Sequence, residues 1–400
     1  MMRTTSAASF DRAMLTGNVH YPVLVRSGDT GRDELTRRAA GLAPDAFWLV
    51  SRAGLPEAHT AWAERLLGPV APVRRLTAPD TPDAPGSPDA SWAVRPAPGS
   101  VVVALGGTGV LDAAARLAVR AADTARGDPT GRGPRLILLP TTPRAMTDTA
   151  FTLERPGAPG TAPALVWAQL DLLTTLPPSA LRSGLAALVR NVLAVSPAFY
   201  DSVGALLRPD LTGYDALPLA RAVALSAEIR ATLMCYDPRE QGPATAFRYG
   251  RTVADALLSL RTGLGHGDAL ALGMLAAARI AVLAGLLGPA AERAHHELLD
   301  RWGAPRELPA PLTAADVATA LRRGPTAGPV PLPHTHTHTH THGLFTTDGP
   351  APGWTVATAK PVTYRVRFAP DVFAPDNPAL ATAGAADGAL APSRRLLVVK

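Results

Sequence analysis

The sequence predicts an α/β + α protein of two domains, in which an N-terminal α/β domain precedes a mostly helical domain. At 400 residues, 47% of them hydrophobic, the chain is longer than one hydrophobic core usually serves. Short apolar strands alternate with helices through its first third, which is typical of a parallel sheet covered by helices. From Leu170 onward, apolar residues recur at the three- and four-residue spacing of helices.

The α/β domain is expected over residues 21–163, after a loose arm over residues 1–20. Its expected elements are strands at 21–26, 46–51, 100–104 and 135–139 and helices at 33–40 and 110–122. Residues 78–98 are rich in Pro, Asp, Ser and Gly and are expected to form a loop. The irregular, Pro- and Gly-rich segment at 155–163 marks the predicted domain junction.

One strand–turn–helix segment has the character of a phosphate site. The strand at 100–104 runs into Leu105-Gly106-Gly107-Thr108-Gly109 and then a helix, so backbone amides and the helix dipole converge there. The pattern is not GxGxxG, and an ordinary tight turn of an α/β sheet explains it equally well. Thr141 and Thr142 follow the next strand, with Asp148 close behind, at the sheet edge where ligands of open α/β sheets bind.

The helical domain is expected over residues 164–323. Its expected helices are 179–195, 199–207, 216–236, 245–260, 268–287 and 289–302. Residues 324–400 are expected to form a low-complexity His–Thr loop and a C-terminal extension, with strands at 354–359 and 362–368.

Two histidine patterns each allow a functional and a structural interpretation. His266-Gly267-Asp268 opens an apolar run, where it could hold a metal or a substrate anion, or where Asp268 could simply cap the helix. The alternating histidines from His334 to His342 would share one face of an extended strand and could bind a divalent metal. Such tracts also arise as solvated low-complexity sequence.

Composition excludes several classes of function. The net charge of +6 is scattered, without a basic run, so nucleic acid is not an expected partner. The single cysteine, Cys235, excludes an internal disulfide framework and a cysteine zinc site and fits a reducing cytoplasm. Residues 269–288 are apolar but interrupted by Arg279, which favours a core helix over a membrane span.

Five segments in order resemble the sugar phosphate cyclase superfamily, which is 3-dehydroquinate synthase-like, and within it 2-deoxy-scyllo-inosose synthase of aminoglycoside biosynthesis. The segments are VVVALGGTG, LLPTTPRAMTDTAFTLE, the run from PALVWAQLDLL to VRNVLAV, RYGRT, and HGDALALGMLAAARIA. The resemblance implies the dehydroquinate synthase-like fold. It also implies that NAD oxidises a sugar-phosphate hydroxyl, that phosphate is eliminated, and that re-reduction and aldol closure form a carbocycle.

The resemblance carries the family's site residues onto this chain. Its cofactor-binding positions are matched by Gly106, Gly107, Asp112, Thr141, Thr142 and Thr175. Its catalytic positions are matched by Asp148, Arg190, Arg230 and His266, with arginines where the family has lysines. The family also implies a divalent metal, Zn or Co, held by one glutamate and two histidines.

Several positions depart from the family pattern. Of the three metal ligands only His266 remains, because the glutamate position is Ala187 and the first histidine position is Arg251. A catalytic metal ordinarily needs three protein ligands, and a guanidinium repels a cation. A metal is therefore not expected to bind, and Arg251 is expected to fill its place, paired with Asp255, Asp268 or Asp148.

Further substitutions remove positive charge from the substrate side. Glu154 replaces a family lysine, and residues 325–328 lack the family's NKRG element. No other lysine can compensate, because the chain has only Lys360 and Lys400. The GExxKT-like element before the glycine turn is also missing, so the expectation for NAD binding stays open.

These observations favour a non-catalytic cyclase homologue that acts as a partner or regulator in an aminoglycoside-type pathway. It would form a homodimer or pair with an active paralogue, since the family dimerises through its N-terminal domain. The alternative is an active NAD-dependent cyclase, a carbon–oxygen lyase, acting on a sugar phosphate such as glucose 6-phosphate. In that case His266 and Asp148 would serve as acid and base.

Overall fold

The computed structural model describes most of the first 323 residues and two short strands beyond them. The described residues are 8–16, 19–29, 31–79, 94–124, 135–210, 214–261, 263–323, 331–332 and 346–347, all within one compact unit, Met1–Ala357. The predictions for the His334–His342 tract, for residues 325–328 and for strands at 354–359 and 362–368 lie outside these ranges, as does most of the 78–98 loop.

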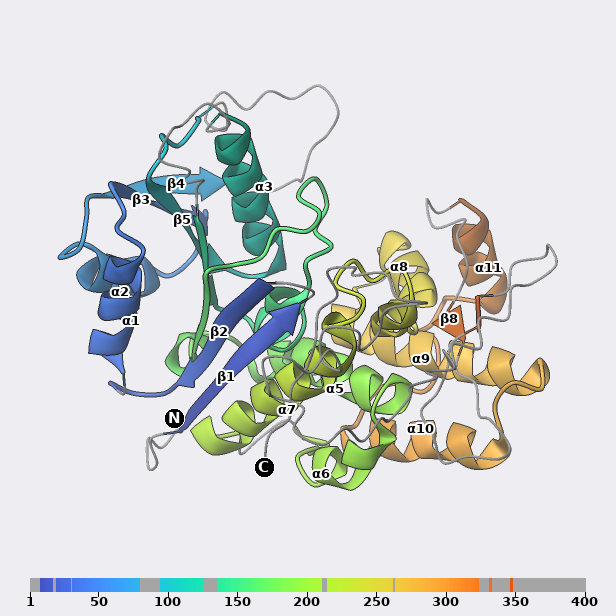
Figure 1. Ribbon diagram of the computed structural model, residues 1–400. Coiled ribbons are helices and arrows are strands. Elements are labelled where there is room, and N and C mark those ends of the chain that lie inside the picture. Colours follow the sequence, from blue (N-terminus) through green and yellow to red (C-terminus); the bar gives the residue numbers. More distant parts are fainter. Residues whose placement is uncertain are drawn as a thin grey trace, which may run out of the picture. The chain divides into compact units, whose positions relative to one another are not determined.

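A seven-stranded mixed sheet forms the N-terminal part, in the order β1-β2-β7-β6-β5-β3-β4 (Figure 1). Its strands are β1 (Ser9–Thr16), β2 (Val19–Arg26), β3 (Ala46–Arg52), β4 (Val73–Ala78), β5 (Ser100–Gly106), β6 (Arg135–Pro140) and β7 (Leu165–Gln169). Only the β1–β2 pair is antiparallel. The central strands β5, β6 and β7 are almost wholly buried and apolar, as expected of parallel strands covered on both faces.

Helices cover both faces of the sheet, and each face has its own cluster of buried apolar residues. On one face α1 (Arg32–Gly41) and α2 (Glu57–Leu67) pack on alternate strand residues such as Leu49 and Val103 (Figure 1). On the other face α3 (Thr108–Thr124) packs on the intervening residues, such as Val50 and Val102, in a cluster that continues into the helical part. Alternate strand residues point to opposite faces of the sheet. One face therefore packs on α1 and α2, and the other shares a core with α3 and the helical part.

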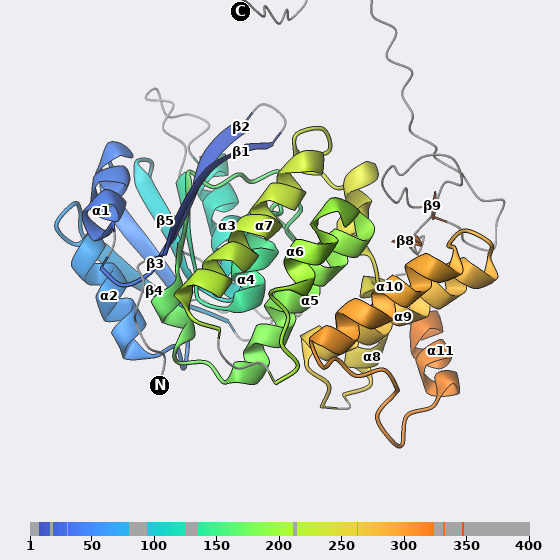
Figure 2. The same cartoon turned by 90° about the horizontal axis from the view of Figure 1, so that it is seen from below.

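The rest of the described chain is mainly helical. The helices are α4 (Pro143–Thr147), α5 (Leu181–Ala194), α6 (Tyr200–Gly204), α7 (Ala216–Met234), α8 (Arg251–Ser259), α9 (His266–Leu283), α10 (Pro289–Arg301) and α11 (Ala314–Arg323). Figure 2 shows α8 to α11 grouped together, with α5 between them and the sheet. A two-stranded ribbon, β8 (Pro331–Leu332) with β9 (Thr346–Thr347), follows.

Helix α9 is the only helix of the described chain that is long and apolar enough to cross a membrane, yet 56% of it is buried inside the protein. It packs against α5, α8 and α10, so it behaves as a core helix, in agreement with the Arg279 interruption. The fold class and the alternation of its elements are confirmed.

Three details of the predicted secondary structure are wrong. The expected loose arm contains β1, an edge strand of the sheet. The sheet continues past the predicted junction at residue 163, because β7 pairs with β2 and β6. The helix expected at 245–260 is instead a 3-10 helix, Pro243–Arg248, followed by α8. The two are separated by Tyr249 and by Gly250, which has a φ of 74°. The division into two domains stays a prediction.

Candidate functional site

A cavity of about 510 Å³ lies at the carboxyl edge of the sheet, a size typical of small-molecule sites. All six predicted cofactor-binding residues line it: Gly106, Gly107, Asp112, Thr141, Thr142 and Thr175. The structure therefore brings together positions that are spread over 70 residues of sequence, and their binding role remains a prediction.

The glycine turn is tight because neighbouring side chains occupy the space that a Cβ would need. A Cβ at Gly106 would lie 2.6 Å from the side chain of Val110, and one at Gly107 would lie 3.1 Å from Cγ2 of Thr142. Helix α3 begins directly after this turn, at Thr108. The turn and the start of α3 thus form one wall of the cavity. Because glycines carry no side chain, a phosphate could come close to the backbone amides there.

Two lining residues also have structural tasks. Oγ1 of Thr142 accepts a hydrogen bond from the backbone N–H of Ala145 at 3.3 Å, and so caps α4. Asp112 accepts a hydrogen bond from Nη1 of Arg155 at 3.1 Å. The Arg155 side chain is fully buried, and burial lowers its pKa although Asp112 opposes that effect. Sequence reasoning did not single out Arg155, which stands in the irregular segment after Leu153.

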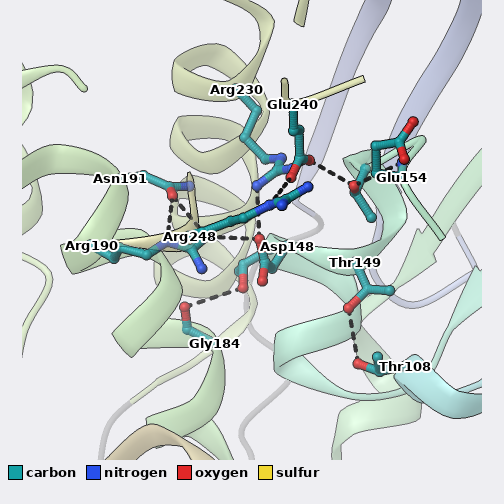
Figure 3. Close-up of polar contacts among 12 residues, drawn as sticks. Thr108, Asp148, Thr149, Glu154, Gly184, Arg190, Asn191, Arg230, Glu240 and Arg248 are labelled. Atoms are coloured by element: carbon teal, nitrogen blue, oxygen red, sulfur yellow. Dashed lines mark hydrogen bonds and ion pairs between the residues drawn. The ribbon is translucent and has the colours of Figure 1, made fainter. Parts of the chain in front are cut away.

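Asp148 lies at the centre of a buried network of ion pairs (Figure 3). Nη2 of Arg190 on α5 and Nη1 of Arg230 on α7 each donate to its Oδ1 at 2.8 Å. Burial would raise the pKa of Asp148, but the two arginines outweigh burial and hold the pKa well below its usual range. Three of the four predicted catalytic residues are therefore brought together, as one fixed ionic cluster.

The network continues to Glu240, which sequence reasoning missed. Nη2 of Arg230 donates to Oε1 of Glu240 at 2.7 Å (Figure 3). The hydroxyl of Thr152 donates to the same oxygen at 2.6 Å. The Arg230 guanidinium also lies 4.2 Å from the ring centroid of Phe247, close enough for a cation–π contact. Both terminal nitrogens of this guanidinium thus have a carboxylate partner, whereas its Nε finds no hydrogen-bond partner among the described residues.

The three family metal positions lie at the starts of two helices and within a third. His266 is the first residue of α9, Arg251 is the first residue of α8, and Ala187 is buried in α5. Gly250 places Arg251, because a Cβ at Gly250 would lie 2.8 Å from the backbone nitrogen of Met274 on α9. Helix α9 begins after Gly265 without a side-chain cap, so the interpretation of Asp268 as the N-cap is wrong.

Of the three carboxylates considered as ion-pair partners of Arg251, the structure shows Asp255 beside it. Its Nε lies 3.4 Å from Oδ2 of Asp255 in an exposed pair on α8. Instead, Oδ1 of Asp268 lies 3.4 Å from Nη1 of Arg182, and Asp148 forms ion pairs with Arg190 and Arg230.

The residues at the metal positions do not fit a divalent metal. Together they supply one donor, and no group of three His, Cys, Asp or Glu side chains with metal-site geometry occurs among the residues that the structure describes. His266 lies in a positive field. Burial, followed by the charges of Arg144, Arg251 and Arg190, lowers its pKa to about 3 even though Asp148 acts in the opposite direction.

Arg144, which sequence reasoning did not single out, adds to this positive field. It lies in α4, between the threonine pair and Asp148, and burial lowers its pKa. Its Nε is buried and finds no hydrogen-bond partner in the described part of the chain. A mainly buried cation of this kind makes the surroundings of His266 suitable for an anion and unsuitable for a metal ion.

The cavity residues do fit a nucleotide. The glycine turn leaves no room for a side chain, and His59 of α2, with only 5% of its surface exposed, also lines the cavity. Its Nδ1 is buried without a hydrogen-bond partner in the described structure, and burial lowers the pKa of His59, so the ring is neutral. An orphaned polar atom in a cavity wall is expected where a ligand completes the hydrogen bonding.

Sequence comparison finds the 3-dehydroquinate synthase C-terminal family over residues 184–324. The chain is 31% identical over 316 residues to 2-deoxy-scyllo-inosose synthase of Streptomyces kanamyceticus, covering 74% of this chain and 78% of that one. It is 33% identical over 157 residues to 3-dehydroquinate synthase of Xanthomonas campestris pv. campestris (strain 8004), covering 38% of this chain and 42% of that one.

Solved structures share the fold. A 2-deoxy-scyllo-inosose synthase complexed with carbaglucose-6-phosphate, NAD+ and Co2+ superposes with a TM-score of 0.66 at 19% identity, over 84% of this chain and 97% of that one. The 2-epi-5-epi-valiolone synthase of Streptomyces hygroscopicus subsp. jinggangensis 5008, with NAD+ and Zn2+ bound, gives 0.61 at 16% identity, over 84% of this chain and 95% of that one.

Proposed function

The chain belongs to the sugar phosphate cyclase family, and from this membership we propose that it is a non-catalytic member. It keeps the nucleotide cavity of the fold and has lost the metal-dependent cyclase chemistry. One observation carries this proposal: at the three positions that hold the metal in the family, the chain supplies Ala187, Arg251 and His266. One imidazole beside a guanidinium cannot hold a catalytic divalent ion.

The ionic cluster around Asp148 supports the same conclusion. A carboxylate that must gain or release a proton near neutral pH needs a pKa close to that pH. The pKa of Asp148 is held far below this range by Arg190 and Arg230, and the same two arginines stand where the family uses lysines that can lose a proton. Asp148 therefore serves to neutralise two buried cations, which is a structural role.

The cavity at the sheet edge would hold a nicotinamide dinucleotide. Its pyrophosphate would lie on the Gly106-Gly107 turn at the start of α3, with Thr141 and Thr142 beside it. When bound, this cofactor supplies reversible hydride transfer. In a chain without the metal, the cofactor acts as a bound ligand that stabilises the folded protein, since ligands that bind only the native state do so by mass action.

We propose that the biological role is that of a partner or regulatory copy in an aminoglycoside-type pathway. The chain would form a homodimer or pair with an active paralogue, and a sugar phosphate would be its small-molecule ligand. The positive surroundings of His266, with Arg144 and Arg251, are chemically suited to such an anion.

A phosphate-release assay tests this function. The purified chain is incubated with NAD, Co2+ and glucose 6-phosphate, beside an active 2-deoxy-scyllo-inosose synthase as the positive control. The proposal expects no phosphate release above the enzyme-free blank. Release that depends on both NAD and this chain would establish the alternative, an active carbon–oxygen lyase.

A further inference from the structure

One cation near His266 has no counter-charge in the part of the chain that the structure describes. The side chain of Arg144 forms neither an ion pair nor a hydrogen bond with another described residue, and its Nε atom is buried. Asp148 attracts Arg144 from beyond ion-pair distance, but its carboxylate already pairs with Arg190 and Arg230. A partly buried charge without a partner costs free energy, so Arg144 is suited to an anion that the described residues do not supply.

The other carboxylates of the ionic cluster, of α8 and of α9 each lie beside an arginine other than Arg144. The pairs are Glu240 with Arg230 at 2.7 Å, Asp255 with Arg251 at 3.4 Å and Asp268 with Arg182 at 3.4 Å. Among the described residues of this region, the positive charge in excess is therefore the one on Arg144.

Close backbone contacts bring α4, α5 and the start of α9 to one place. A Cβ at Gly184 of α5 would lie 2.7 Å from Cβ of Pro143, the residue before Arg144. A Cβ at Gly267, the residue after His266, would lie 2.5 Å from the backbone carbonyl carbon of the second residue of α5. Arg144 and His266 therefore both follow from segments that pack on the first turn of α5.

Ala187 leaves this place without the carboxylate that the family resemblance assigns to it. It lies three residues after Gly184, so the two positions share the face of α5 that packs on α4. Ala187 is 1% exposed and carries only a methyl group. Relative to the family pattern, the place has thus lost a negative charge at Ala187 and gained a positive charge at Arg251.

Arg251 adds a second guanidinium from α8. It is the first residue of that helix, which packs on α9 at Gly250. Burial lowers the pKa of Arg144 and of His266, and the charge of Arg251 lowers both further. The Arg251 side chain is 52% exposed, so a ligand can reach it from water.

Guanidinium groups and an imidazole are donors that suit a phosphate group. A guanidinium donates two parallel N–H groups to phosphate oxygens, which gives geometric selectivity as well as charge. The imidazole of His266 can donate one further hydrogen bond. A divalent cation would instead meet two positive charges and a single ligand.

We propose that a phosphate group binds at the place of the family's metal, held by Arg144, with Arg251 and His266 beside it. The inference rests on the proposed function, because it requires that the metal centre is lost. It also names the group of a sugar phosphate that this place takes, and it assigns the binding to Arg144, which the family resemblance does not carry over.

Calorimetric titration of the full chain with inorganic phosphate, at constant ionic strength, tests the site. The wild type is expected to bind phosphate. Arg144→Met keeps an unbranched side chain and removes the charge, so it should weaken binding at least about tenfold, the loss of one charge-assisted contact. Glucose 6-phosphate should compete with phosphate on the wild type, and glucose should not.

Thermal melts show whether Arg144→Met folds and give a second measurement. In phosphate-free buffer the variant should melt at the same temperature as the wild type or higher, because an unpaired cation has been removed. Added phosphate should raise the melting temperature of the wild type and leave that of the variant unchanged.

Arg37→Met is the matched control, because Arg37 is an exposed arginine of α1, and it should bind phosphate as the wild type does. Phosphate binding that survives Arg144→Met, as expected of an ion on the glycine turn, overturns the inference. A wild type that does not bind phosphate also overturns it. Both results leave the proposed function standing, because the phosphate-release assay judges that function separately.

Discussion

Arg190 and Arg230, on two different helices, donate to one and the same atom, Oδ1 of Asp148, each at 2.8 Å. A single carboxylate oxygen thus joins α5 and α7 to the segment that follows the threonine pair. These three side chains form one ionic cluster, which is further tied through Arg230 to Glu240. Under the proposed function this cluster has a structural role, and several measurements can examine this.

Asp148→Asn should destabilise the protein by about 3 kcal/mol, because it leaves two buried guanidinium groups without their shared anion. The exposed fractions of the Arg190 and Arg230 side chains are only 4% and 1%, so water cannot replace the carboxylate. The free energy of unfolding from urea denaturation checks this.

Asp255→Asn is the matched control, because Asp255 and Arg251 form an exposed pair in which 38% and 52% of the side chains are accessible. Its effect should stay below about 1 kcal/mol. Equal effects of the two substitutions would show that the Asp148 cluster is not the structural element described above.

The stability of the helical region should fall between pH 7 and pH 5 because of His295. Its ring lies 2.8 Å from the hydroxyl of Tyr249, which precedes Gly250 and Arg251, and burial lowers its pKa to about 4. The unfolded chain binds a proton below pH 6.5 and the folded chain does so only near pH 4, so stability decreases as the pH falls through this window.

For this one group the expected loss from pH 7 to pH 5 is about 2 kcal/mol. Urea denaturation at both pH values, with the wild type and His295→Gln, isolates the contribution. The variant should be less stable at pH 7 and should show a smaller loss on acidification. A loss of the same size in both proteins would contradict the assignment to His295, and His20→Gln, at an exposed position of β2, serves as the control.

Restoring the family ligands should create a metal site. The double variant Ala187→Glu, Arg251→His adds two donors to His266 and removes the repelling cation, so one Co2+ per chain is expected to bind. Without metal, the new glutamate is buried and unpaired, because Ala187 is 1% exposed, and the variant should be less stable than the wild type.

Adding Co2+ at about 100 times its dissociation constant should then restore about 2.7 kcal/mol. The Co2+-induced stabilisation is measured by thermal melts with and without the metal. The wild type and Arg251→His alone serve as controls, because they show how much stabilisation comes from metal bound elsewhere on the chain. Equal Co2+ stabilisation of all three proteins would contradict the proposed placement of the three positions.

Local sequence patterns were enough to predict that the residues of the candidate nucleotide cavity lie together. Gly106 and Gly107 follow a buried strand, and Thr141 and Thr142 follow the next one, so the common edge of a parallel sheet brings them together. Most helices of the C-terminal part were found by their apolar spacing, whereas α2, α4 and α11 were not predicted. The strand at Ser9–Thr16 was missed because it is an edge strand with mostly exposed or half-buried residues, and its apolar signal is weak.

The ionic partners could not be predicted, because they are set by packing between distant segments. Arg155 reaches Asp112 from an irregular segment, and Glu240 reaches Arg230 from the loop after α7. Nothing in the local sequence distinguishes these residues from ordinary surface charges. The hypothesis that Arg251 replaces the metal stays a prediction, and the described ion-pair partner of Arg251, Asp255, lies one turn along the same helix.

Anomalous diffraction from crystals of the unmodified chain grown with Co2+ tests the central claim most directly, because it locates each metal ion individually. The account predicts no anomalous peak within bonding distance of His266, and a guanidinium of Arg251 beside it. A fully occupied Co2+ peak on His266, with two further protein donors around it, would contradict the claim that this cyclase relative has lost its metal centre.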